Sequence, residues 1–239
     1  MIAKSKVDIV LPCFNPGSSW HKELLSFYDL AKNKYDLNFV LVNDGSQVHT
    51  LEKQLAELQD ANIPISYFHY TENKGKGFAL RHGVEKSTAP YVVYTDVDFP
   101  FTNQSIVDLL DKLIQSNCDV VLGHRNNQYY QKKMSAFRKF LSRAFRVFLK
   151  SILHMPVTDT QCGLKGFNHV GKKAFLQTSI NRYLFDFEFI YNICHNKQIT
   201  FQTAEVQLKE NVHFSKMRLK ILLQETLNLM KVLVKSNNK

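Results

Sequence analysis

The sequence is poor in several features that mark whole classes of protein. Its 239 residues include only 9 glycines and 6 prolines, which excludes collagen-like and low-complexity chains. The 4 cysteines lie far apart without a CxxC pair, so no disulfide framework is expected and a reducing compartment is favoured. No apolar run reaches the roughly 18 residues of a membrane-spanning helix, and the N-terminal segment lacks the pattern of a signal peptide. These absences predict one ordinary globular domain that is soluble or lies on a surface.

Acidic residues are missing from one long segment and nearly missing from another, so the positive charge of the chain is concentrated in these two segments. The formal net charge is +10 at pH 7. From Val120 to Thr158 the chain has eight lysines and arginines and no acidic residue, and from Asn211 to the end it has six against a single glutamate. Because the basicity lies in two segments, we expect an anionic partner to meet one part of the surface.

Short β-branched or aromatic runs alternate with helical patterns through the first half of the chain. We expect strands at residues 7–11, 39–42, 65–70, 91–94 and 119–122, and helices at 20–31, 48–59, 77–86 and 104–116. This alternation predicts an α/β fold with a mostly parallel sheet that is flanked by helices on both faces. Ligands of such sheets bind beyond the carboxyl ends of the strands.

Polar, turn-forming loops follow the first four expected strands. These loops are residues 12–17, 43–46, 71–77 and 95–98. Turn formers are common at strand ends, but four successive loops with charged groups favour a ligand site over ordinary turns. The sequence therefore predicts a site at one edge of the sheet.

Two basic amphipathic segments occupy the second half of the chain. Residues 134–153 and 217–234 place large apolar side chains at helical spacing and lysines and arginines on the remaining surface. Such segments are either core helices with a solvated face or helices that lie among membrane headgroups. We divide the chain into a domain at 1–210, which includes the amphipathic segment 132–153, and a C-terminal basic helix and tail at 211–239.

Asp96 and Asp98 are two residues apart at the end of an expected strand, so their side chains emerge on one face if the strand conformation persists. Two neighbouring carboxylates repel each other unless a cation lies between them, and oxygen ligands suit Mg²⁺ or Mn²⁺. The simpler alternative is that both carboxylates cap the helix that begins near Thr102.

Two further loops carry groups suited to a nucleotide. Asp44 follows a buried strand and can accept hydrogen bonds from a base or a sugar hydroxyl, or it can stabilise its own turn. The segment Asn73–Gly77 combines glycines, which let the backbone approach a phosphate, with lysines and a following helix N-terminus. It lacks the Walker and Rossmann spacings, so ATPase and dehydrogenase functions are not favoured.

Eight motifs in a fixed order carry a family resemblance: DIVLPCFNPG, LVNDGS, NKGKGFALRHG, YTDVDFPF, VVLGHR, FRKFLSR, DTQCGLKGF and YLFDFEFI. With these motifs the chain resembles the inverting family 2 glycosyltransferases, and among them the polyprenyl-phosphate sugar synthases of the dolichyl-phosphate mannose synthase and dolichyl-phosphate β-glucosyltransferase types. The resemblance implies a GT-A fold with a Rossmann-like central sheet. It also implies Mg²⁺ or Mn²⁺ as the cofactor.

The resemblance assigns roles to residues of the first four loops and to Gln161. Asp96 and Asp98 match the D-x-D pair that holds the metal and the donor diphosphate. The residues implied to bind the nucleotide sugar are Pro12, Asn15, Asp44, Lys74, Gly75, Lys76, Gly77, Asp96 and Gln161.

Arginines are implied at the phosphates of donor and lipid acceptor, and acidic residues at the sugar. The lipid-phosphate candidates are Arg125, Arg138, Arg143 and Lys216, and the catalytic candidates are Asp98, Arg125, Arg138, Asp159, Asp186 and Glu188. Without the resemblance, the Asp159 loop is a turn and residues 185–189 are the start of a helix that buries three phenylalanines.

The implied activity is transfer of a hexose from a UDP-glucose-like or GDP-mannose-like donor to a polyprenyl phosphate. One departure weakens a mannose assignment, because mannose synthases commonly place a metal-binding glutamine where this chain has Pro100. The expected location is cytoplasmic, peripheral on the cytoplasmic face of an anionic membrane. A soluble or polymeric glycan acceptor is the alternative. A basic nucleic-acid-binding protein is a more distant one, and we expect no nucleic-acid partner because no known DNA or RNA motif accompanies the charge.

Overall fold

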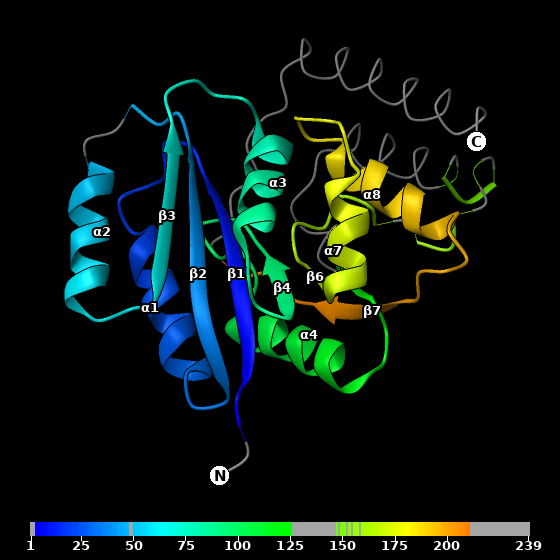
Figure 1. Cartoon of the computed structure of the whole chain (residues 1–239), viewed down its shortest axis with the longest axis horizontal. Coiled ribbons are helices and arrows are strands. Elements are labelled where there is room, and N and C mark those ends of the chain that lie inside the picture. The colour runs from blue at the N-terminus through cyan, green and yellow to red at the C-terminus, as the bar shows by residue number, and fades with distance from the viewer. Residues whose placement is uncertain are drawn as a thin grey trace.

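A computed structural model describes residues 3–47, 50–125, 147, 149–151, 153, 155–157 and 159–210 of the chain. In this described part, seven strands form a single sheet: β1 (Ser5–Cys13), β2 (Tyr35–Asp44), β3 (Ile65–Tyr70), β4 (Tyr91–Tyr94), β5 (Val120–Arg125), β6 (Lys165–Phe167) and β7 (Phe201–Val206). The helices that flank the sheet are α1 (Trp20–Ala31), α2 (Thr50–Asp60), α3 (Lys76–Lys86), α4 (Asn103–Gln115), α7 (His169–Leu176) and α8 (Phe185–Cys194). Figure 1 shows this arrangement.

The strand order is β3-β2-β1-β4-β6-β5-β7, and β6 alone among these strands runs antiparallel to its neighbours. From β1 the chain proceeds outward to β2 and β3 and then returns to place β4 on the other side of β1. The carboxyl ends of β1 and β4 therefore form a topological switch point, which is where parallel sheets leave a crevice for a ligand.

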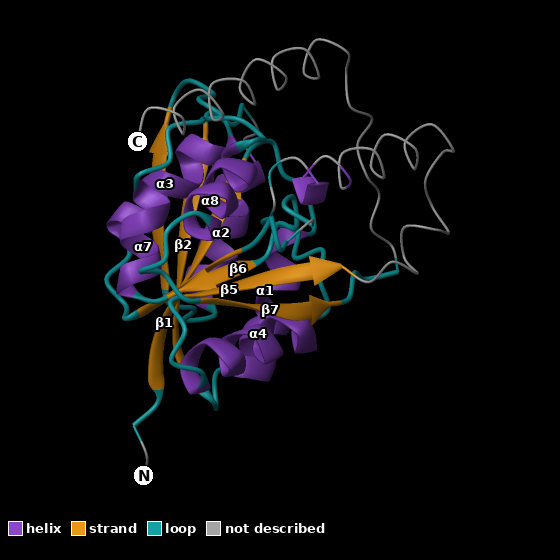
Figure 2. Ribbon diagram, turned by 90° about the vertical axis from the view of Figure 1, so that its right-hand side faces the viewer, coloured by secondary structure: helices purple, strands orange, loops and turns teal. Residues whose placement is uncertain are grey.

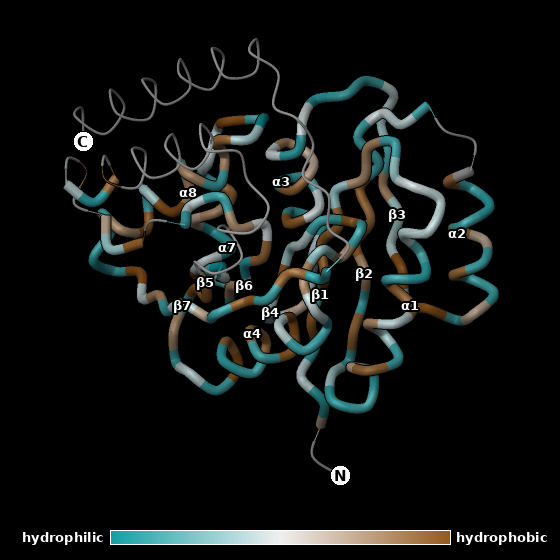
Figure 3. Tube along the Cα trace, turned by 180° about the vertical axis from the view of Figure 1, so that it is seen from behind, coloured by the Kyte–Doolittle hydropathy of each residue, from teal (hydrophilic) through white to brown (hydrophobic). Residues whose placement is uncertain are grey.

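Alternate residues of β1, β2, β4 and β5 enter two separate hydrophobic clusters. On one face, Ile9 and Leu11 of β1 pack with apolar residues of α1, α2 and α4. On the other face, Val10 packs with residues of α3, α7 and α8. Figure 2 shows α4 on one side of the sheet and α3, α7 and α8 on the other, and Figure 3 shows hydrophobic stretches along β2. This three-layer packing holds the strand ends in fixed positions.

The predicted α/β fold with a mostly parallel, helix-flanked sheet is confirmed. Three expected elements, at 20–31, 65–70 and 91–94, have the observed bounds. The sequence analysis did not predict β6, β7 or α7. Most of 134–153 and all of 217–234 lie outside the described residues, as do Arg138, Arg143 and Lys216. Among the helices that are described, none has the length and apolar character of a membrane span.

Candidate active site

A cavity of about 320 Å³ lies at the switch point and is lined by residues from all four polar loops. Its lining residues are Pro12, Cys13, Phe14, Asp44, Asn73, Gly75, Lys76, Asp96, Arg182 and Tyr183. The sequence placed a site at this sheet edge, and five of its nucleotide-sugar candidates line the cavity: Pro12, Asp44, Gly75, Lys76 and Asp96.

Asp44 ends β2 and holds the glycine-rich loop in place. Its buried carboxylate accepts hydrogen bonds from the backbone N–H of Lys74 at 2.7 Å, from the backbone N–H of Gly75 at 3.0 Å and from the side chain of Asn73 at 2.9 Å. This carboxylate also raises the pKa of Tyr70, although burial has the larger effect. Asp44 therefore shapes the cavity wall as well as lining it.

The loop needs glycines because the backbone of another segment lies too close for a side chain. Gly75 has φ +101°, and a Cβ built on it would lie 2.5 Å from the carbonyl oxygen of Asn181. A Cβ on Gly77 would lie 2.5 Å from the carbonyl oxygen of Ile180. The start of α3 thus packs directly on the segment that leads into α8.

Gly75→Ala is expected to lower the free energy of unfolding by about 3 kcal/mol, because the new methyl group meets backbone and forces a positive φ on alanine. Gly17→Ala is the matched control, since a Cβ there meets nothing within 4 Å. Chemical denaturation of both variants measures the difference. An equal effect of the two substitutions would contradict this account of the loop.

The D-x-D pair lies in a tight turn after β4. The backbone N–H of Phe99 donates to the carbonyl oxygen of Asp96 at 2.9 Å, and Phe99 has φ +45° with its ring fully buried. Thr102 itself caps α4, because its side chain accepts from the backbone N–H of Ser105. Asp96 and Asp98 are therefore not needed as helix caps.

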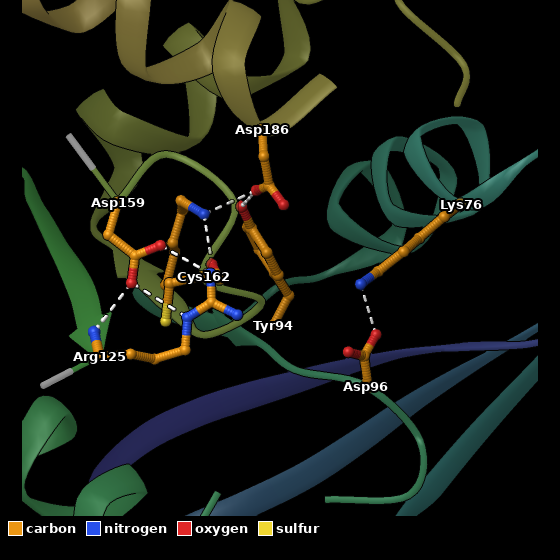
Figure 4. Close-up of polar contacts among 8 residues, drawn as sticks. Lys76, Tyr94, Asp96, Arg125, Asp159, Cys162 and Asp186 are labelled. Atoms are coloured by element: carbon orange, nitrogen blue, oxygen red, sulfur yellow. Dashed lines mark hydrogen bonds and ion pairs between the residues drawn. The ribbon is translucent and has the colours of Figure 1, made fainter. Parts of the chain in front are cut away.

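Lys76 forms an ion pair with Asp96 (Figure 4). Burial would lower the pKa of Lys76, but the negative charges of Asp96 and Asp186 outweigh it and raise that pKa. A Cβ on Gly163 would lie only 3.1 Å from Oδ2 of Asp96, so the loop that carries Gln161 approaches the D-x-D turn.

The donor chemistry of Asp96 and Asp98 fits a hard divalent cation. Partial desolvation, and then the charge of Asp96, raise the pKa of Asp98, as expected for two neighbouring carboxylates. No group of three or more acidic, histidine or cysteine ligands occurs in the part of the chain that the structure describes. Mg²⁺ is commonly bound by one or two carboxylates, and substrate phosphate oxygens and water complete its coordination shell.

Arg125 and Asp159 form a second charged unit beside the sheet. The Arg125 Nη2 lies 2.6 Å from Asp159 Oδ1, and Nε lies 3.0 Å from Oδ2, so the contact is bidentate. Burial alone would raise the pKa of Asp159, but the hydrogen bonds and charge of Arg125 lower it. Both residues were predicted from the sequence as catalytic candidates, and the structure brings them together.

Asp159→Asn is expected to lower the free energy of unfolding at pH 7 by about 3 kcal/mol, because Arg125 loses its charged partner. Since the pKa of Asp159 is lowered in the folded protein, its stabilisation is complete above the unfolded value of about 3.9 and is lost as the pH falls through the folded value. Denaturation of wild type and variant at pH 7 and pH 3.5 should therefore show a smaller difference at the lower pH. A difference that does not depend on pH, or one matched by the exposed control Asp60→Asn, would contradict this.

A fully buried lysine lies next to this unit. Lys165 Nζ donates to Asp186 Oδ1 at 2.7 Å and to the carbonyl oxygen of Cys162 at 2.5 Å. The hydroxyl of Tyr94 donates to the same oxygen of Asp186 at 2.5 Å, and burial and the Asp186 charge keep the pKa of Tyr94 well above its usual value. Figure 4 shows Asp186 and Tyr94 between the Arg125–Asp159 unit and the Lys76–Asp96 pair.

Other candidates lie outside the cavity lining. The carboxylate of Glu188 accepts from the backbone N–H groups of Ser179 and Ile180, both at 2.8 Å. Asn15 bonds to the loop after β2, and the ammonium of Lys74 lies 4.8 Å from the ring centre of Phe78. Asp98, Gly77 and Gln161 also do not line the cavity.

Sequence reasoning missed several residues of the site. Phe14 and Asn73 lie inside loops that the sequence analysis selected, but neither residue was singled out. Arg182 and Tyr183 precede α8 and follow no strand, so the strand-end rule could not find them. Lys165 lies in a three-residue strand that has no sequence signal.

The fold of this chain is similar to the folds of solved structures. Glucosyl-3-phosphoglycerate synthase from Mycobacterium tuberculosis, in complex with Mn²⁺, UDP and phosphoglyceric acid, matches with a TM-score of 0.64 and 14% identity over 97% of this chain and 78% of that chain. Mannosyl-3-phosphoglycerate synthase from Rubrobacter xylanophilus matches with a TM-score of 0.66 and 12% identity over 97% and 74%. The sheet and its flanking helices define a GT-A fold.

The family follows from the sequence. The model of glycosyl transferase family 2 matches residues 8–183, well over half of the chain. The protein belongs to this family.

Curated relatives include dolichyl-phosphate β-glucosyltransferases. The one from Dictyostelium discoideum is 25% identical over 201 residues, which cover 77% of this chain and 61% of that protein. The one from Saccharomyces cerevisiae is 25% identical over 236 residues, which cover 90% and 70%. The chain therefore spans less than two thirds of the Dictyostelium relative.

Proposed function

We propose that this glycosyltransferase moves a hexose from a nucleotide sugar to a polyprenyl phosphate, with inversion at the anomeric carbon. The observation that carries the proposal is the switch-point cavity, which gathers Asp44, Lys76, Asp96 and glycine-rich backbone at one place. The relatives named dolichyl-phosphate β-glucosyltransferase support a glucose donor and a lipid phosphate acceptor.

The charges of the cavity suit the departure of a nucleoside diphosphate. Negative charge develops on the diphosphate as its bond to the sugar C1 breaks, and preorganised cations lower the barrier to that step. Lys76, which lies beside Asp96, would be one such cation. Asp96 and Asp98 would hold Mg²⁺ or Mn²⁺, which neutralises part of the diphosphate charge when bound.

The acidic catalytic candidates form ion pairs and hydrogen bonds within the protein, and this supports a phosphate acceptor over a hydroxyl acceptor. A hydroxyl needs a general base, whereas a phosphate oxygen is already ionised at neutral pH. Asp159 is paired with Arg125, and Asp186 is paired with Lys165. Glu188 uses both carboxylate oxygens on the turn at Ser179. These contacts favour an acceptor from which no proton has to be removed.

The basic segments 132–153 and 211–239 would bring the protein to an anionic membrane surface. Each lysine or arginine near such a surface contributes about 1 kcal/mol, and apolar side chains add burial in the headgroup region. Flotation with anionic vesicles at low salt tests this, with neutral vesicles as the control. Failure to float with either would count against a lipid acceptor reached at the membrane.

A direct test offers labelled UDP- and GDP-sugars together with polyprenyl phosphate or the matching polyprenol. We expect label in the organic phase from one donor, with the phosphate acceptor only and with Mg²⁺ or Mn²⁺ but not EDTA. Label transferred only to a soluble glycan would replace the lipid acceptor with the alternative one.

A further inference from the structure

Arg182 and Tyr183 line the cavity although they belong to no strand-end loop. The guanidinium of Arg182 has no carboxylate partner within the described residues, and its Cγ lies 3.2 Å from the position of a Cβ on Gly75. Tyr183 is 51% exposed, and so is Phe14 on the first loop. One unpaired cation and two exposed aromatic rings thus line the same cavity.

The segment that carries these two residues is braced rather than free. Glu188 of α8 accepts from the backbone N–H of Ile180 at 2.8 Å, and Arg81 of α3 donates to the carbonyl oxygen of Ile180 at 2.7 Å. The backbone N–H of Gly77 donates to the carbonyl oxygen of Asn181 at 2.8 Å. Figure 1 shows the segment entering α8 beside α3. The wall is therefore formed before any ligand arrives.

Among the described residues, no carboxylate pairs with Arg182, whereas the other charged groups of the cavity lining are engaged. Asp96 is paired with Lys76, and Asp44 is engaged by the backbone of the glycine-rich loop. An arginine offers a planar fork of donors that matches phosphate oxygens. Exposed aromatic rings offer a face on which a nucleobase can stack.

We propose that Arg182 and Tyr183 are donor-binding residues of this site. Arg182 hydrogen-bonds to the diphosphate of the nucleotide sugar, and Tyr183, with Phe14, supplies an aromatic surface for the nucleoside. Glu188 and Arg81 act as positioning residues that hold the segment against α3. This inference rests on the proposed function, because it takes a nucleoside diphosphate as the ligand.

Titration calorimetry with UDP and with GDP, in the presence of Mg²⁺, tests the inference on the full chain. Arg182→Gln should weaken binding about 10- to 100-fold and flatten its dependence on salt, and Arg182→Lys should recover part of the loss. Tyr183→Ala should weaken binding about tenfold, and Tyr183→Phe, which keeps the ring, should recover most of that loss. Lys197→Gln, which removes one positive charge from an exposed loop, is the matched control.

The outcomes separate this inference from the proposed function. If wild type binds one nucleotide, and the dissociation constants of Arg182→Gln and Tyr183→Ala are both within twofold of the wild-type value, the inference is overturned and the proposed function stands. Wild type that binds neither nucleotide would overturn both. Unchanged thermal unfolding of the variants, expected because both side chains are exposed, assigns any loss to binding.

Discussion

Lys165→Met is expected to lower the free energy of unfolding at pH 7 by about 3 to 5 kcal/mol, because it leaves the carboxylate of Asp186 buried without its charged partner. Lys165 is fully buried and its ion pair with Asp186 is almost closed to solvent. Methionine has a similar shape, so little of the loss should come from packing. Denaturant unfolding followed by the single tryptophan, Trp20, measures the change.

A second substitution distinguishes the loss of a charged partner from a packing defect. Adding Asp186→Asn should recover much of the loss, and the exposed control Lys197→Met should be neutral. A loss below about 1 kcal/mol, or one that Asp186→Asn does not reduce, would contradict the assigned role of the pair.

Asp98→Asn is expected to reduce sugar transfer about a thousandfold or more, because a neutral amide cannot share a divalent cation with Asp96, and a bound metal contributes several kcal/mol to the barrier. Asp98 is exposed beside Asp96, so its replacement should leave the fold intact. Initial rates at saturating donor, with Mg²⁺ and with Mn²⁺, measure the effect.

A binding measurement shows whether that loss belongs to the metal. Wild type should bind the nucleotide more tightly with Mg²⁺ than with EDTA, and Asp98→Asn should lose this difference. Asp108→Asn, which removes an exposed carboxylate from α4, is the matched control. Transfer by Asp98→Asn within threefold of wild type would contradict a metal role for the D-x-D pair.

The helices and strands that could be predicted from the sequence are those that a local pattern of residues determines. Strand β4 is a continuous run of valine and tyrosine, β3 is rich in aromatic residues, and α1 repeats its apolar residues at helical spacing, so their bounds can be read directly. The strand β6 has only three residues, including Lys165 and Gly166. Its pairing with β4 and β5 is a tertiary effect, and no local pattern encodes it.

The site was predictable to the same extent. Asp44 and Asp96 follow strands whose carboxyl ends must meet, so the topology alone brings them to one cavity. Arg182 lies more than 80 residues further along the chain, and only the packing of Gly75 and Gly77 on the Ile180–Asn181 backbone places it there. Glu188 has the acidic character of a catalytic residue, but whether it faces a substrate or braces a turn is decided by hydrogen bonds that the sequence does not reveal.

The most direct measurement of the central claim is the NMR analysis of the product formed from an α-linked nucleotide sugar and polyprenyl phosphate. The account predicts a sugar joined to the lipid phosphate with the β-configuration at the anomeric carbon, since in-line attack inverts that centre. A product that retains the α-configuration, or release of free sugar with no bond to the acceptor phosphate, would contradict it.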